Sequence, residues 1–283
     1  MKTMNFEKEF FSLYPDYKFL LGYIHEALHK EEVNFSDLTS LNLHAIAGHI
    51  LSKVSRNSAV TYFSKIKGFL NMVSEEVELP TTKYNNILKS KKEPQDNVAL
   101  TEDEVARIDR YYQDLLKKKT RNIEKDVLTL FLIECYCGGR GVDVEQMTLA
   151  NIAEGRLSYV SQKTHILATI PAHHRLHELL CHKPEKEYSR MTKNRIIKNV
   201  CKKCGIDEEV TIFYHGRMAT RKKYEYCGFH TARRSFASML AAKGVPVVEI
   251  SQYMSHANIS MTERYIKVDR NQASAAAMSF FGG

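Results

Sequence analysis

The sequence predicts a mainly helical α+β protein, built from two domains and containing a small β-sheet. Its length of 283 residues fits about two domains of ordinary size, each large enough to bury its own core. Most patterned segments show the three-and-four spacing of apolar residues that amphipathic helices have. One stretch near the middle instead contains two short β-prone runs. With 43% hydrophobic and 26% charged residues, the chain falls in the globular range.

The amino-terminal third is expected to be a helical domain. Apolar residues from Ser58 to Val73 recur at helical spacing, and Leu41 to Val54 and Phe10 to Leu28 are patterned similarly. The charged stretch from Lys89 to Asn97 contains a proline and has no apolar residue to bury. This stretch is therefore the predicted linker between the two domains.

A second domain is predicted to begin directly after this linker. Thr101 and Glu104 form a capping-box pattern that opens a helix. A buried helix is expected from Ile123 to Tyr136, ended by the two glycines that follow Cys137. The runs between Leu157 and Pro171 predict a hairpin, with Lys163 at or near its turn.

The end of the chain predicts short helices and an apolar tail. Ser235 to Lys243 is expected to be helical, and Pro246 is placed to open the next helix. A further capping-box pattern, Ser260 to Glu263, would put Tyr265 in the first turns of a short helix.

Charge and hydropathy restrict the classes of function. The net charge is +8, and nearly all of it falls in residues 96–283, as expected for a domain that binds a polyanion. The longest apolar run, Val127 to Cys137, is interrupted by Thr129 and Glu134 and is too short to cross a bilayer. We therefore expect a cytoplasmic protein with no membrane partner, whose six cysteines remain thiols.

Four places in the second domain combine residues that could bind and cleave a phosphate ester. They are Arg140 with Asp143, then Lys163, then His230 with Arg233, and finally His256 with Tyr265. Taken singly, each has an ordinary explanation, such as a surface ion pair, an exposed turn lysine or a packed tyrosine. Their joint occurrence in one order along the chain is the informative feature.

This ordered set resembles the tyrosine recombinase (phage integrase) family. The resemblance covers most of residues 100–270 and includes flanking sequence such as CGGRGVDVEQMTLANI, SQKTHILATIP, FHTARRSFASML and MSHANISMTERYIKV. Residues 1–90 are similar to the family's helical core-binding domain in pattern only. Three departures concern neighbouring positions: Arg234 replaces a second histidine, Ala232 a leucine, and Met254 and Ser255 the usual Leu-Gly before histidine.

The resemblance implies a domain plan and a catalytic domain of the tyrosine recombinase type. That plan consists of a SAM-like DNA-binding domain at 1–90, a linker at 91–99, a catalytic domain at 100–272 and a tail at 273–283. The tail, with its alanines, Met278, Phe280 and Phe281, would dock into a neighbouring protomer.

The implied activity is that of a site-specific recombinase or integrase, as carried by mobile elements, which cleaves and rejoins DNA through a 3′-phosphotyrosyl intermediate. Tyr265 would be the nucleophile, and Arg140 and Arg233 would stabilise charge on the phosphate. The remaining implied roles are general base for His230, general acid for Lys163, hydrogen-bond donor for His256 and orientation of Arg140 for Asp143.

The implied partners are double-stranded DNA and further copies of the chain, in a tetramer on DNA, with accessory DNA-bending proteins as additional candidates. Neither a metal nor ATP is expected as cofactor. Integration, excision, inversion and dimer resolution are all compatible with the sequence.

Three alternatives remain open at this stage. A type IB topoisomerase-like enzyme would nick and close one strand, and a silent regulator would bind DNA without cleaving it. Cys201 and Cys204, with His215 and Cys227 downstream, could instead hold zinc, although a lone C-x-x-C pair is a weak signal.

Overall fold

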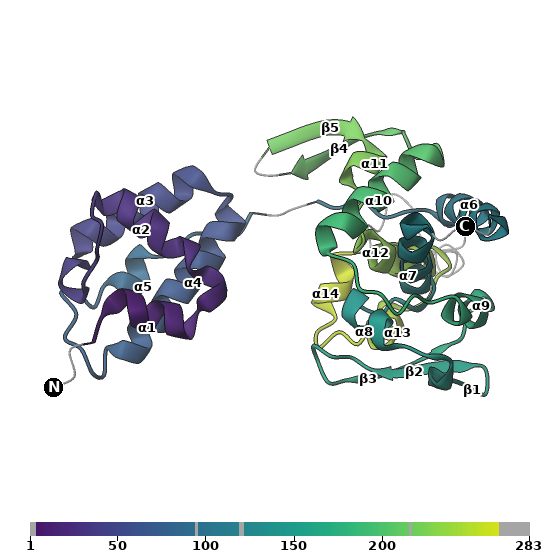
Figure 1. The fold of residues 1–283 in the computed structure, drawn as a ribbon, viewed down its shortest axis with the longest axis horizontal. Coiled ribbons are helices and arrows are strands. Elements are labelled where there is room, and N and C mark those ends of the chain that lie inside the picture. The colour runs from purple at the N-terminus through teal and green to yellow at the C-terminus, as the bar shows by residue number, and fades with distance from the viewer. Residues whose placement is uncertain (1–3, 94–95, 119–121, 215–216, 266–283) are drawn as a thin grey trace, which may run out of the picture. The chain divides into compact units, whose positions relative to one another are not determined.

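The computed structural model describes residues 4–93, 96–118, 122–214 and 217–265 (Figure 1). The chain divides into two compact units, Met1–Asp96 with Phe213–Met218 and Asn97–Ile212 with Ala219–Gly283. The described residues are mostly helical and include two small sheets, which confirms the predicted fold class. None of the described helices has the length and apolar character needed to cross a bilayer.

Helices form the first unit around an aromatic core. They are α1 (Phe6–Leu13), α2 (Phe19–Leu28), α3 (Ser40–Lys53), α4 (Arg56–Val73) and α5 (Tyr84–Ile87), with 3₁₀ turns at Pro15–Tyr17 and Phe35–Asp37. Phe6, Phe10 and Phe69 are fully buried, and Phe69 packs edge to face on the other two rings. The predicted helices are present, but Phe10 to Leu28 is divided between α1 and α2, because Pro15 begins a 3₁₀ turn there.

The second unit carries most of the remaining elements. Its helices are α6 (Glu102–Lys117), α7 (Ile123–Cys137), α8 (Gly141–Gln146), α9 (Arg175–Cys181), α10 (Arg190–Lys203), α11 (Lys223–Tyr226), α12 (Thr231–Ala242), α13 (Val247–Tyr253) and α14 (Ser260–Glu263), with a 3₁₀ turn at Leu149–Asn151. The strands are β1 (Ile152–Ala153), β2 (Arg156–Val160) and β3 (Leu167–Pro171), and a separate hairpin is formed by β4 (Glu209–Tyr214) and β5 (Arg217–Lys222).

Helix α7 is the central element of the second unit. It packs against α6, α9, α10 and α12 (Figure 1). Its side chains from Val127 to Cys135 are buried, as is that of Cys137. As predicted, it ends at Gly138, which has a left-handed φ of 66°. A Cβ at this position would overlap the ring of Phe236 on α12, so the glycine is required both for its conformation and for close packing.

The predicted hairpin is confirmed. Strands β2 and β3 are antiparallel, with Val160 opposite Leu167 and Arg156 opposite Pro171, and β1 adds a short third strand. Alternate residues of β2 and β3 are buried, because one face of the sheet packs on the core. Lys163 lies in the loop between the two strands, as expected.

Four sequence-based details near the carboxyl end are wrong. Helix α12 begins at Thr231, four residues before the expected start, and Pro246 is the N-cap of α13 instead of its first residue. The capping box proposed at Ser260 does not form, since Ser260 lies inside α14 and Asn258 accepts its backbone N–H. Tyr265 therefore follows this short helix and is not part of it. The tail at 273–283 lies outside the described residues.

Candidate active site

The predicted site residues come from five separate segments of the second unit. Arg140 is the N-cap of α8, Asp143 lies within α8, and Lys163 occupies the β2–β3 loop. His230 is the N-cap of α12 and Arg233 lies in its first turn. His256 lies between α13 and α14, and Tyr265 follows α14.

The carboxylate of Asp143 joins Arg140 to the β2–β3 loop. It accepts hydrogen bonds from the backbone N–H of Arg140 at 3.2 Å, the hydroxyl of Ser161 at 3.2 Å and the backbone N–H of Gln162 at 2.8 Å. The Arg140 guanidinium donates to the Ser161 hydroxyl at 2.7 Å and lies 4.0 Å from the Asp143 carboxylate. Asp143 is buried, so this network holds the Arg140 side chain in one place.

Lys163 is exposed, and its loop is fastened on both sides. Gln162 is bonded to Asp143, and the hydroxyl of Thr164 donates to the carbonyl of Ser255 at 3.1 Å. The Lys163 ammonium makes no hydrogen bond or ion pair with the described part of the chain. It is therefore free to reach a ligand from a loop whose base is fixed beside the site.

Arg233 is the largest fully buried side chain among the described residues, with an exposed fraction of 1%. Its guanidinium donates to the carbonyl oxygen of Gly138, at the end of α7, and to that of Met254 at 2.5 Å. These two bonds use two of the five N–H groups of the fork, which leaves the others for further acceptors. Arg233 thus connects two chain segments at the site and supplies a fixed positive charge.

His256 is held by α14. Its Nδ1 lies 2.7 Å from the hydroxyl of the buried Thr262, which orients the ring. The preceding residue, Ser255, has a φ of 49° in the left-handed region, where glycine is normally preferred. Glycine would adopt this conformation without strain, whereas serine adopts it here at some cost.

Tyr265 reaches the site within the same chain. Its hydroxyl lies 3.2 Å from Nε2 of His230, and its ring is 5.6 Å from that of His256 between centroids. Two backbone hydrogen bonds fix the segment: the Tyr265 N–H donates to the carbonyl of Thr262 at 2.8 Å, and the Ser238 hydroxyl donates to the Tyr265 carbonyl at 2.9 Å. Six of the seven predicted residues are therefore brought together within one chain, and the Lys163 side chain makes no interaction with them.

Positive charge dominates the electrostatics of this site. Burial and then the charge of Arg233 lower the pKa of Arg140. Burial and the neighbouring arginines also lower the pKa of His230 to about 4 and that of His256 to about 3. Both imidazoles are consequently neutral near pH 7, and two arginines that repel each other favour an anion between them.

Sequence reasoning missed several supporting residues. Ser161, Gln162, Thr262 and Ser238 orient the predicted groups, but polar residues of these types are common and carry no distinguishing pattern. Glu134 did leave a signal, because a carboxylate inside the apolar run of α7 is unusual. It is fully buried and lies against the ring of His230.

The described residues contain no group of three or more His, Cys, Asp or Glu side chains that could hold a metal. A hydrogen bond with Cys227, together with burial, raises the pKa of the Cys201 thiol. Cys204 is half-buried, and His215 lies outside the described residues.

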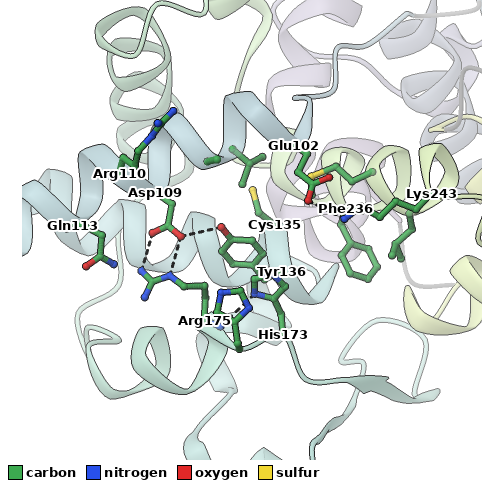
Figure 2. Close-up of a pocket in the computed structure, with 15 residues that line it drawn as sticks. Glu102, Asp109, Arg110, Gln113, Cys135, Tyr136, His173, Arg175, Phe236 and Lys243 are labelled. Atoms are coloured by element: carbon green, nitrogen blue, oxygen red, sulfur yellow. Dashed lines mark hydrogen bonds and ion pairs between the residues drawn. The ribbon is translucent and has the colours of Figure 1, made fainter.

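A separate pocket of about 440 Å³ lies between α6, α7, α12 and the segment before α9. Figure 2 shows the Arg175 fork and the Tyr136 hydroxyl pointing toward Asp109, which accepts hydrogen bonds from both at 2.8 to 3.0 Å. None of the seven predicted site residues lines this pocket, so it is distinct from the site described above.

The family model of the phage integrase family matches residues 67–272, well over half of the chain. The chain therefore belongs to the phage integrase family, which is the tyrosine recombinase family. No curated protein sequence gives a significant match to it.

Three solved structures with a similar fold can be compared with the chain. XerH recombinase bound to difH substrate is 14% identical with a TM-score of 0.65, over 94% of this chain and 79% of that one. A lambda integrase tetramer bound to a Holliday junction is 18% identical with a TM-score of 0.63, over 93% and 74%. The Tn1549 transposon integrase with transposon right end DNA is 12% identical with a TM-score of 0.59, over 99% and 100%. Family and fold are thus those of DNA recombinases.

Proposed function

We propose that this protein is a site-specific DNA recombinase that cleaves and rejoins strands through a covalent link between Tyr265 and a DNA 3′-phosphate. The observation that carries the proposal is the 3.2 Å separation between the Tyr265 hydroxyl and Nε2 of His230, beside the guanidinium groups of Arg140 and Arg233. A nucleophile, a base and an anion-stabilising pair are the groups that phosphoryl transfer from DNA requires.

In the cleavage step, the Tyr265 oxygen attacks phosphorus while its proton passes to Nε2 of His230. The bond between phosphorus and the 5′ oxygen breaks, and the Lys163 ammonium donates a proton to that oxygen. A 3′-phosphotyrosine and a free 5′-hydroxyl result. The reverse reaction with a 5′-hydroxyl restores the phosphodiester, and since the bond energy is retained, rejoining needs no nucleotide.

Arg140 and Arg233 would stabilise the charge that develops on the non-bridging oxygens. Both are fixed before the substrate arrives, one through the Asp143 network and the other by its carbonyl acceptors, so little reorganisation is needed. A bound phosphate would also offset their mutual repulsion. The interaction is therefore strongest as negative charge builds up in the transition state.

Strand exchange between two duplexes requires several such sites acting together. We propose a tetramer on double-stranded DNA, supported by the likeness in fold to a lambda integrase tetramer bound to a Holliday junction. The basic charge of residues 96–283 supports phosphate contacts, and the first unit would act as the core-binding domain. The segment 273–283 would link neighbouring subunits.

Trapping of the covalent complex tests the proposal. The full chain is expressed in cells, isolated under denaturing conditions, and the DNA attached to it is sequenced. A nicked duplex of the recovered sequence then serves as substrate for purified protein. Wild type should form an adduct, and Tyr265→Phe should lower its formation by roughly 1,000-fold or more while still binding the duplex.

Tyr253→Phe is the matched control, because this tyrosine lies nearby at the end of α13 and is half-buried. It should form the adduct normally. An adduct on the Tyr265→Phe variant would show that the nucleophile is another residue. An adduct that reseals without exchanging partners in a two-duplex assay would favour a nicking-closing enzyme instead.

A further inference from the structure

Glu134 is a carboxylate buried in the middle of the apolar helix α7. Its exposed fraction is 0%, and neither of its side-chain oxygens has a hydrogen-bond partner within the described residues. Burying an unsatisfied carboxyl group is costly, and an aliphatic residue would pack in this helix without that cost. A group of this kind points to a role in the site that it borders.

The ring of His230 borders Glu134 on the side of the site. Nδ1 of His230 lies 3.8 Å from Oε1 of Glu134, and Nε2 of the same ring lies 3.2 Å from the Tyr265 hydroxyl. The imidazole therefore lies between a buried carboxyl group and the proposed nucleophile. The side chain of His230 is 45% exposed, so a movement of about 1 Å that brings Nδ1 into hydrogen-bond range of Glu134 is available to it.

Other charged and titratable groups surround this pair. Those that act on the Glu134 carboxyl are Arg233 and Arg234 on α12, Lys193 on α10, Asp143 and Glu145 on α8, and the thiols of Cys135 and Cys137 on α7. Those that act on His230 are Arg140, Arg190, Arg233 and Arg234. The positive charges favour an ionised carboxylate at Glu134 and disfavour a protonated imidazole at His230.

His230 alone would be a weak base. Burial and four arginines lower its pKa to about 4, whereas the proton must come from a phenol whose ordinary pKa is about 10. A carboxylate beside Nδ1 stabilises the imidazolium and raises the basicity of Nε2. Burial raises the pKa of Glu134 well above its ordinary value, so the carboxylate in turn gains from a cation formed next to it. Each partner thus favours the charged form of the other.

We propose that Glu134 is a positioning residue, whose carboxylate accepts a hydrogen bond from Nδ1–H of His230 and so leaves Nε2 as the atom that takes the Tyr265 proton. This role rests on the proposed function. In the step, the O–H bond of Tyr265 breaks, an N–H bond forms at Nε2, and the Nδ1 proton remains on the ring. Glu134 changes no covalent bond and touches no substrate atom.

The test compares Glu134→Gln with wild type in the adduct assay between pH 5.5 and 8.5. Glutamine keeps the size of the side chain and removes its charge. The rate of adduct formation at pH 7 should fall by about 10- to 100-fold. This is less than the loss expected from removing a general base, because His230 itself remains. The acidic limb of the pH–rate profile should move to lower pH for two reasons. Loss of the carboxylate lowers the pKa of His230, and the variant no longer has the Glu134 carboxyl group, whose pKa is raised and which would otherwise titrate in this range.

Glu124→Gln makes the same chemical change on the same helix and is the matched control. The Glu124 carboxylate pairs with the Lys203 ammonium at 2.8 Å and does not contact His230. This variant should leave the rate and the pH profile unchanged. Glu134→Asp keeps the charge on a shorter side chain and should give an intermediate rate with the wild-type profile. The melting temperature of Glu134→Gln should be equal to or above that of wild type, since glutamine has no ionisable group whose charge burial would penalise.

Each outcome decides the role. A Glu134→Gln variant with the wild-type rate and pH profile overturns it, and so does a rate loss that only follows a lower melting temperature. If Tyr265→Phe loses the adduct in the same assay, the proposed function stands even when this role fails. If wild type forms no adduct at all, the proposed function fails first and the role fails with it.

Discussion

The guanidinium of Arg233 donates a hydrogen bond of 2.5 Å to the carbonyl oxygen of Met254. That carbonyl precedes Ser255 and His256, so the arginine positions the segment that carries a histidine of the site. The same side chain donates to Gly138, two residues before Arg140. One buried cation therefore fixes the backbone on both sides of the proposed phosphate position.

We predict that Arg233→Ala loses both adduct formation and stability. The substitution leaves a cavity and two buried carbonyl groups without their donor, which should lower the free energy of unfolding by roughly 2 to 4 kcal/mol. Arg233→Lys retains the charge and should preserve more stability, yet it should still impair cleavage, because lysine lacks the planar fork.

Urea denaturation and the adduct assay on the same preparations measure these two effects. DNA binding by Arg233→Lys, followed by gel shift, should fall much less than its cleavage rate. Equal losses in binding and cleavage would indicate an anchoring arginine and would contradict a role in the transition state.

In contrast to Arg233→Ala, a substitution of Lys163 should impair cleavage without lowering stability. Lys163 is exposed, and its ammonium makes no hydrogen bond or ion pair with the described residues, so Lys163→Ala should leave the melting temperature unchanged. Cleavage should fall by about 100- to 10,000-fold, the usual contribution of a general acid.

A substrate with sulfur in place of the bridging 5′ oxygen tests this assignment. A thiolate leaves without being protonated, so Lys163→Ala should cleave it nearly as fast as wild type does. Glu134→Gln should remain slow on the same substrate, because its defect concerns the nucleophile. Lys118→Ala, at an exposed lysine after α6, is the matched control. Failure of the sulfur substrate to rescue Lys163→Ala would exclude the lysine as the acid.

The buried histidine of the site should make stability depend on pH. The pKa of His256 is lowered from 6.5 to about 3 in the folded protein, so the unfolded chain binds more protons below pH 6.5. The free energy of unfolding should therefore fall as the pH decreases from 7 to 5, with about 2 kcal/mol from this group. His230, whose pKa is lowered to about 4, should act in the same direction.

Urea denaturation of wild type and His256→Gln at pH 7, 6 and 5 checks this expectation. The variant should show a smaller decrease in the free energy of unfolding over this range. An equal slope in both proteins would mean that folding does not lower the pKa of His256. Tyr253→Phe again serves as control and should keep the wild-type slope.

Local signals in the sequence were sufficient for the long helices α3, α4, α6 and α7 and for the β2–β3 hairpin, whereas α8 to α11 and the β4–β5 hairpin were not predicted. The end of α7 at Gly138, the capping box at Thr101 and the turn at Lys163 depend on neighbours within a few positions, which the sequence displays directly. The seven candidate residues were found from their order along the chain.

Packing between distant segments decided the rest. The sequence wrongly placed Tyr265 within a helix. In the structure the Ser238 hydroxyl on α12 donates to the Tyr265 carbonyl, and the Tyr265 hydroxyl lies beside His230. The position of Glu134 against the same imidazole depends on how α7 packs against α12. Such contacts join residues far apart in the chain, so periodicity and capping patterns carry no information about them.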